Sequence, residues 1–92
     1  MVSKLTGLTF IVPVFNEQEA ILSTIEALGA QLSTLAVPYE IIVVDDGSTD
    51  HTAVQLDSSS VECLKVIRHP MNAGYGAALK TGLLAAEFEW VG

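Results

Sequence analysis

The chain has 92 residues, of which 50% are hydrophobic and 16% are charged, and its formal net charge is −7. This composition is typical of one small domain with a packed core and excludes a disordered segment. With only four Lys and Arg residues, the chain lacks the clustered cations that bind nucleic-acid backbones or anionic lipid surfaces, so we expect no nucleic-acid partner.

The first predicted elements are a strand and an amphipathic helix. Leu8–Val14 is apolar and reads as a buried strand, with Pro13 at its end because proline has no N–H to donate. Asn16 followed by Glu19 fits a capping box, so we expect a helix to begin there. Its apolar stripe consists of Ile21, Ile25, Leu28, Leu32 and Leu35. Val37 and Pro38 end this helix.

The central stretch runs from Glu40 to Asp50. The β-branched residues 41–44 predict a strand buried on both faces, as in a parallel sheet. Asp45 and Asp46 follow directly, at the end of the strand where ligands bind in open α/β sheets, and Gly47 permits a tight turn. Two neighbouring carboxylates repel each other, so we expect a metal, a ligand donor or backbone N–H groups beside them.

The second half of the chain again predicts a strand, a helix and a strand. Residues 63–68 predict a third strand near the sheet edge, with Cys63 as a small strand hydrophobe. Residues 75–87 predict a helix with Tyr75, Leu79, Leu83 and Ala86 on one face. Gly76 and Gly82 leave room for close backbone approach, and for Gly82 we expect this to serve packing on the sheet. Residues 89–92 read as the start of a fourth strand. The fold class is therefore α/β, a Rossmann-like parallel sheet in the order β-α-β-α-β-α-β.

Other chemistry finds little support in the sequence. Cys63 is the one cysteine, so no intrachain disulfide exists, and no Cys/His cluster has zinc-ligand spacing. His51 and His69 have no partners at such spacing, and we assign them no role. Met1–Lys4 does not lead into a signal peptide, and no apolar run approaches the ~20 residues of a membrane span. We therefore expect a cytoplasmic protein.

Three stretches together resemble one family. They are residues 12–17 (VPVFNE), 43–50 (VVDDGSTD) and 72–82 (NAGYGAALKTG). In this order the three motifs look like the N-terminal part of the family 2 glycosyltransferases, which have the GT-A fold. The third stretch is most similar to the branch of polyprenyl- and dolichyl-phosphate sugar transferases. On this resemblance residues 1–92 form part of a GT-A nucleotide-sugar-binding domain, truncated at the fourth strand.

The resemblance implies a nucleotide-binding role for seven residues. It suggests that a UDP- or GDP-sugar binds across the ends of the first strands, with Asp46 accepting a hydrogen bond from the base and Asp45 supporting its loop. The aromatic ring of Phe15 would lie against the nucleotide. The full set of expected nucleotide-binding residues is Pro13, Val14, Phe15, Glu17, Asp45, Asp46 and Gly74.

The resemblance also implies what this chain lacks. The family's metal-binding Asp-x-Asp lies just after the fourth strand, beyond Gly92, and its catalytic base lies further on. We therefore expect no catalytic residue and no metal ligand here, and a chain that is inactive alone. The full-length enzyme would use Mg²⁺ or Mn²⁺. Its acceptor would be a polyprenyl phosphate, and its membrane contact follows by analogy only.

A second class of function stays open at this point. A receiver-like regulatory module could use Asp45 and Asp46 as a Mg²⁺-binding acid pair. In receiver domains, however, such a pair follows the first strand, whereas here it follows the second. The acid pair could also be an ordinary solvated turn.

The order of strands predicts one further property. In the resembling family the fourth strand lies beside the first, so a short fourth strand leaves Leu8–Val14 partly unpaired. An exposed strand edge invites pairing with another chain. We therefore expect self-association through that edge or through the Trp90 end.

Overall fold

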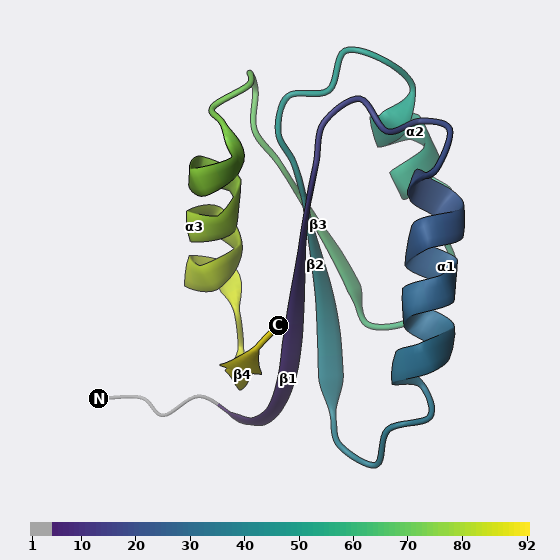
Figure 1. Ribbon diagram of the computed structural model, residues 1–92, viewed down its shortest axis with the longest axis vertical. Helices are drawn as coiled ribbons and strands as arrows, with labels where there is room; N and C mark the ends of the chain where they lie inside the picture. Colours follow the sequence, from purple (N-terminus) through teal and green to yellow (C-terminus); the bar gives the residue numbers. More distant parts are fainter. Residues whose placement is uncertain (1–4) are drawn as a thin grey trace.

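The computed structural model describes residues 5–92, and Met1–Lys4, where we expected no signal peptide, lie outside the described residues. Helices α1 and α2 cover one face of a central sheet and α3 covers the other (Figure 1). All strand pairs are parallel, in the order β3-β2-β1-β4. The predicted α/β class and element order are confirmed. The elements are β1 (Leu5–Val14), α1 (Ile21–Leu32), β2 (Tyr39–Asp45), α2 (Thr52–Asp57), β3 (Leu64–Arg68), α3 (Tyr75–Ala85) and β4 (Phe88–Val91).

Strand β2 is the centre of both hydrophobic layers. Its four apolar residues at 41–44 are fully buried. Because side chains alternate along a strand, Ile41 and Val43 join the layer beneath α1 and α2, while Ile42 and Val44 join the layer beneath α3. Each such side chain stabilises the fold by roughly 1.5–3 kcal/mol relative to exposure. The short β-branched run therefore holds the two helical layers to one sheet.

Helix α1 carries the predicted stripe from Ile21 to Leu32 but begins later than predicted, and Leu35 lies after its end and is exposed. Ile21, Ile25 and Leu32 are buried against the sheet, as expected from their spacing. The helix starts at Ile21 after Ala20, which makes no side-chain capping bond. Asn16 does not cap it, because its backbone is left-handed (φ 53°) and its side chain binds another loop. The capping-box prediction is wrong because Asn16 has tertiary partners.

Strand β3 lies at the edge of the sheet, as predicted, but it begins at Leu64. Cys63 precedes the strand, is exposed and has a positive φ of 61°. It is therefore not the strand hydrophobe that we predicted.

Helix α3 buries a different face from the one predicted. Ala78 and Gly82 are its buried residues, whereas Tyr75 and Leu83 are 71% and 52% exposed. A Cβ at position 82 would come within 2.5 Å of Ile11 Cγ2, so the sheet lies too close for a larger side chain. The large apolar residues of α3 do not mark its buried face, because the close approach to the sheet admits only small residues such as Ala78 and Gly82.

A buried carboxylate joins the strands at the opposite end of β2 from Asp46. Glu40 accepts hydrogen bonds from the Thr9 hydroxyl and the Glu87 N–H, both at 2.7 Å, and pairs with Lys65 at 2.9 Å. Burial is the largest influence on the pKa of Glu40 and raises it. The Glu87, Thr9 and Lys65 contacts outweigh burial, so the pKa lies below its usual value. These contacts tie β1, β3 and the entry to β4 to the central strand.

Strand β4 pairs with β1, as predicted, but over part of its length. Gly92 donates its N–H to Thr9 and accepts from Ile11, and the pairing ends there. By the alternation of a strand, the next β1 residue that faces this edge is Pro13, which has no N–H. The proline therefore removes one hydrogen-bond donor from this edge of β1.

We predict opposite effects for two glycine substitutions in α3. Gly82→Ala should lower the free energy of unfolding by about 1–3 kcal/mol, because its Cβ would overlap Ile11. Gly76→Ala is the matched control, since a Cβ there meets nothing within 4 Å. It should stabilise the fold by up to about 1 kcal/mol through helix propensity. Urea unfolding of both variants tests this, and equal effects would contradict the packing.

Candidate functional site

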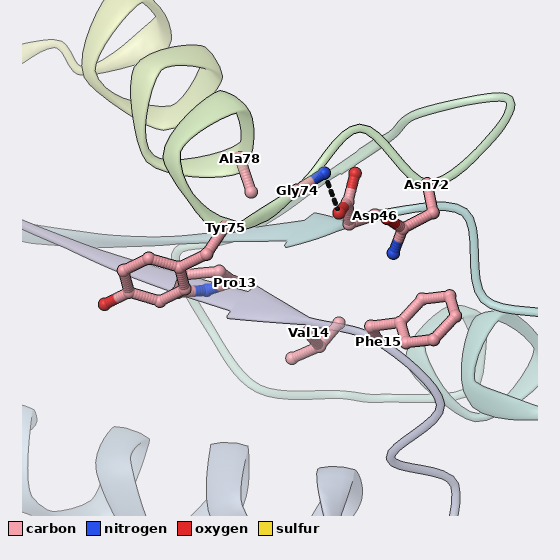
Figure 2. Close-up of a pocket in the computed structure, with 8 residues that line it drawn as sticks. All are labelled: Pro13, Val14, Phe15, Asp46, Asn72, Gly74, Tyr75 and Ala78. Carbon is pink, nitrogen blue, oxygen red and sulfur yellow. Dashed lines mark hydrogen bonds between the residues drawn. The ribbon is translucent and has the colours of Figure 1, made fainter.

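The carboxyl ends of β1 and β2 and the start of α3 surround a hollow of about 320 Å³. Its lining residues come from all three sequence motifs that the sequence analysis singled out. They are Pro13, Val14, Phe15, Asp46, Asn72, Gly74, Tyr75 and Ala78. Figure 2 shows Asp46 beside Gly74 on one side, with Pro13 and Val14 on the neighbouring strand. Five of the seven predicted residues therefore meet in one pocket.

The two neighbouring acids lie on opposite faces of the sheet. Asp45 is fully buried on the α2 side, where it accepts a hydrogen bond from the Ser48 N–H at 3.1 Å. Arg68 Nε lies 3.7 Å from its other oxygen, and the same guanidinium reaches Asp57 of α2. Asp46 faces the loop before α3. The side chains thus do not form a pair, which argues against a receiver-like acid cluster.

Asp46 is the polar centre of the pocket. Its Oδ1 accepts from His69 Nδ1 at 2.7 Å and from the Ala73 N–H at 2.9 Å, and its Oδ2 accepts from the Gly74 N–H at 2.9 Å. The hydrogen bond from His69 is the largest cause that holds the pKa of Asp46 below its usual value. The Ala73 and Gly74 N–H groups add to this effect, and burial opposes it. These three donors hold the residue 69–74 loop over the end of β2.

His69 is a residue of this site that the sequence analysis missed. Its Nε2 lies 2.8 Å from the Thr81 hydroxyl of α3, so its ring joins β2 to α3 through Asp46. A signal was present, since Arg68 is in register with Asp45 and His69 is the first residue after β3. Parallel strands bring the residues after their carboxyl ends together. Zinc-ligand spacing was the wrong test for this histidine.

Phe15 offers an aromatic surface beside the pocket. Its side chain is 43% exposed, so it is not ordinary core packing. The next residue fixes its place, because the Asn16 N–H binds Ser48 Oγ at 2.9 Å and Asn16 Oδ1 accepts from the Thr49 N–H at 2.8 Å. Tyr75, 71% exposed, and Asn72 also line the pocket, and we had not predicted either. Both flank Gly74, which marked the loop in the sequence.

Glu17 lies outside this pocket. Its backbone N–H binds Thr52 Oγ1 at 2.9 Å, and the residue lines a neighbouring hollow together with Ala20 and Thr24. Two further hydrogen bonds join the same two segments. The Gln18 N–H binds Asp50 Oδ2, and the Thr52 N–H binds Asp50 Oδ1. The polar residues 48–52 therefore join two loops and start α2. The expected contact of Glu17 with a nucleotide stays a prediction.

The donors present do not fit a metal ion. In the described part of the chain, 5–92, no three His, Cys, Asp or Glu side chains converge as metal ligands do. Asp46 already accepts three N–H donors, and Asp45 faces the other side of the sheet. We therefore derive no chemical step through a metal from these residues. Across residues 5–92, no helix is long and apolar enough to cross a membrane.

Comparison with known proteins identifies the family. The model of the family described as "Glycosyl transferase family 2" matches residues 9–92. The chain belongs to glycosyl transferase family 2.

Two relatives of this chain are named as transferases that act with undecaprenyl phosphate. An undecaprenyl-phosphate 4-deoxy-4-formamido-L-arabinose transferase of Yersinia enterocolitica is 39% identical over 74 residues, which cover 79% of this chain and 23% of the relative. A transferase of the same name from Serratia proteamaculans is 33% identical over 84 residues, covering 88% and 26%. The family 2 chain thus spans about a quarter of the length of these relatives.

Solved glycosyltransferases of the GT-A fold share the architecture. The crystal structure of S. aureus TarS superposes with a TM-score of 0.73 at 31% identity, covering 94% of this chain and 26% of TarS. A Pyrobaculum calidifontis mannosyltransferase, solved with GDP-Man and Mn²⁺, gives 0.65 at 26% identity, covering 92% and 27%. The predicted family and GT-A fold are confirmed.

We predict that Asp46 makes this family 2 chain sensitive to acid. Because its pKa is lowered on folding, the unfolded state binds the proton more readily. Its stabilisation is present above about pH 4 and is lost as the pH falls through the lower folded pKa. Asp46→Asn should therefore be less stable at neutral pH and should show a flatter pH dependence between about pH 5 and about pH 2.

Urea unfolding across this pH range provides the measurement. Asp57→Asn is the control, because that carboxylate is 71% exposed. The Asp46→Asn variant keeps an acid dependence from Glu40 and Asp50, whose pKa values are also lowered. An Asp46→Asn curve parallel to the wild-type curve would show that the carboxylate contributes nothing to acid sensitivity.

Proposed function

We propose that this chain forms the nucleotide-binding part of a glycosyltransferase, which transfers a sugar from a UDP- or GDP-sugar to an acceptor. The observation that carries the proposal is the pocket at the ends of β1 and β2, where an anchored carboxylate lies among apolar and aromatic residues. A planar base needs both features, a surface to stack on and an acceptor for its N–H. Pro13, Val14 and Phe15 would supply the first and Asp46 the second.

The hydrogen bonds of Asp46 favour uracil over guanine. An ionised carboxylate has about four lone-pair positions, and three are already used by His69, Ala73 and Gly74. Uracil presents one N3–H donor, which matches the one position left on Oδ2. Guanine presents N1–H and an amine side by side, and this donor pair needs both oxygens open. The Asn72 amide, also in the lining, could donate to a uracil carbonyl.

The diphosphate of the donor needs positive charge from elsewhere, because the chain has a net charge of −7. We propose that the full-length enzyme uses a divalent cation, Mg²⁺ or Mn²⁺, and that residues other than 5–92 hold it. The Pyrobaculum neighbour, solved with GDP-Man and Mn²⁺, supports this. The N-terminus of α3, which follows Gly74, would face the diphosphate side with its free N–H groups.

The acceptor is proposed from the relatives alone. Those of Yersinia and Serratia are named undecaprenyl-phosphate transferases, which supports a polyprenyl-phosphate acceptor and contact with a membrane surface. Since the pocket carboxylate Asp46 already accepts three N–H donors, we propose that its role is in donor binding and that the 92-residue chain does not transfer the sugar by itself.

An NMR titration with UDP and GDP, with and without Mg²⁺, tests the donor site. We expect saturable shifts of the Phe15, Asp46 and Gly74 amides, with UDP binding more tightly than GDP. Mg²⁺ alone should leave the Asp45 and Asp46 amides unchanged, whereas shifts there would support the receiver-like alternative. No shift with either nucleotide at millimolar concentration would contradict a pocket that binds on its own.

Aromatic truncation gives a matched test of the pocket. Phe15→Ala should weaken UDP binding by about fivefold, because stacking of one ring contributes on the order of 1 kcal/mol. Leu84→Ala is the control, since Leu84 is 77% exposed on α3 and is not in the lining. Equal affinities of the two variants would remove Phe15 from the proposed site.

The expected self-association stays a prediction. It concerns the β1 edge, where Pro13 has no N–H and reduces the capacity for pairing with another strand. If the edge associates, it should do so weakly, so sedimentation velocity should show a mass that rises with concentration. A monomer at every concentration up to the millimolar range would contradict this prediction.

A further inference from the structure

The His69 ring lies between a pocket carboxylate and a helix hydroxyl. Its Nδ1 is 2.7 Å from Asp46 Oδ1, its Nε2 is 2.8 Å from Thr81 Oγ1, and the side chain is 16% exposed. We propose that His69 is a positioning residue, which orients the Asp46 carboxylate for the base while Thr81 fixes the orientation of the ring. This inference rests on the proposed nucleotide site and adds a residue to it.

The two contacts define which nitrogen carries the proton. Asp46 accepts hydrogen bonds only, so His69 Nδ1 must carry a hydrogen to bind it. In the neutral ring Nε2 is then an acceptor, and the Thr81 hydroxyl donates to it. Because a hydroxyl can donate or accept, Asp46 sets the tautomer, and Thr81 supplies the donor that the neutral Nε2 then needs. The order of donation runs from Thr81 through His69 to the carboxylate.

The His69 contact confines the one open acceptor position of the Asp46 carboxylate to Oδ2. Oδ1 receives both His69 and Ala73, whereas Oδ2 receives only Gly74. Without His69, Oδ1 would regain an open position and the carboxylate could turn about its Cβ–Cγ bond. A base N–H would then meet a less ordered acceptor. We therefore expect His69 to affect affinity and base preference without touching the nucleotide.

The first test uses the chain without nucleotide. Long-range ¹⁵N NMR at pH 9 should show His69 with a protonated Nδ1 and an unprotonated Nε2. The Asp46 carboxyl ¹³C signal should titrate at higher pH in His69→Leu than in the wild type, because the largest cause of its lowered pKa is removed. The opposite tautomer, or an unchanged Asp46 titration in His69→Leu, would overturn the proposal.

The second test separates positioning from bulk. His69→Asn places an amide N–H near the position of Nδ1, so it should keep UDP affinity within about threefold, whereas His69→Leu should lose about tenfold. The Leu variant should also lose part of the preference for UDP over GDP. His51→Asn is the control, since His51 is exposed and binds Gln18. Equal losses in the Asn and Leu variants would overturn the proposal.

A third variant covers the case in which His69→Leu does not fold. Thr81→Val keeps the shape of the side chain but removes the hydroxyl that binds Nε2. It should shift the ¹⁵N signal of Nε2, because that nitrogen loses its hydrogen-bond partner, and an unchanged ring spectrum would overturn the role of Thr81. If the wild type binds neither UDP nor GDP, the proposed function fails, while the measurements without nucleotide still decide whether His69 orients Asp46.

Discussion

The site depends on one carboxylate that is almost fully buried. Asp46 is 4% exposed, and its burial would be costly without the three donors that it gathers from His69, Ala73 and Gly74. Those donors come from residues 23 to 28 positions further along the chain. The same hydrogen bonds that stabilise the charge therefore bring the loop before α3 to the end of the sheet. The pocket exists because this loop and Phe15 lie on either side of Asp46.

Successive side chains at the end of β2 point to opposite faces of the sheet, so Asp45 and Asp46 have different roles. Asp45 faces α2 and joins Arg68 and the Ser48 backbone, and the residues that follow hold the β1–α1 loop through Asn16 and Gln18. Asp46, one residue further, faces α3 and the pocket. The hydroxyls of Ser48 and Thr52 thus order the loops that present Phe15. A motif that looks like a single ligand-binding cluster is half scaffold and half site.

Local patterns in the sequence were enough for the framework. The run at 41–44, the α1 stripe and the Pro and Gly breaks predicted the strand and helix order, because burial of apolar residues decides those features locally. Residues whose partners lie far along the chain were misread. Asn16 binds Thr49 instead of capping a helix, and His69 binds Asp46 and Thr81. Gly82, in contrast, packs against Ile11 of the sheet as predicted. Only the parallel register, which pairs Arg68 with Asp45, could have indicated His69 in advance.

The two ends of β2 show how a buried acid becomes a structural or a binding group. Glu40 is neutralised by Lys65, and its other oxygen accepts two donors, so it joins β1, β3 and the entry to β4. Asp46 is held by two backbone N–H groups and a histidine, and no lysine or arginine among the described residues 5–92 pairs with it. Its negative charge is therefore not offset by a cationic side chain and acts on any group that enters the pocket. A neutral base with an N–H fits such a group, whereas a phosphate would be repelled by it. On the proposed function, a nucleotide would therefore enter base first, with its diphosphate directed away from Asp46.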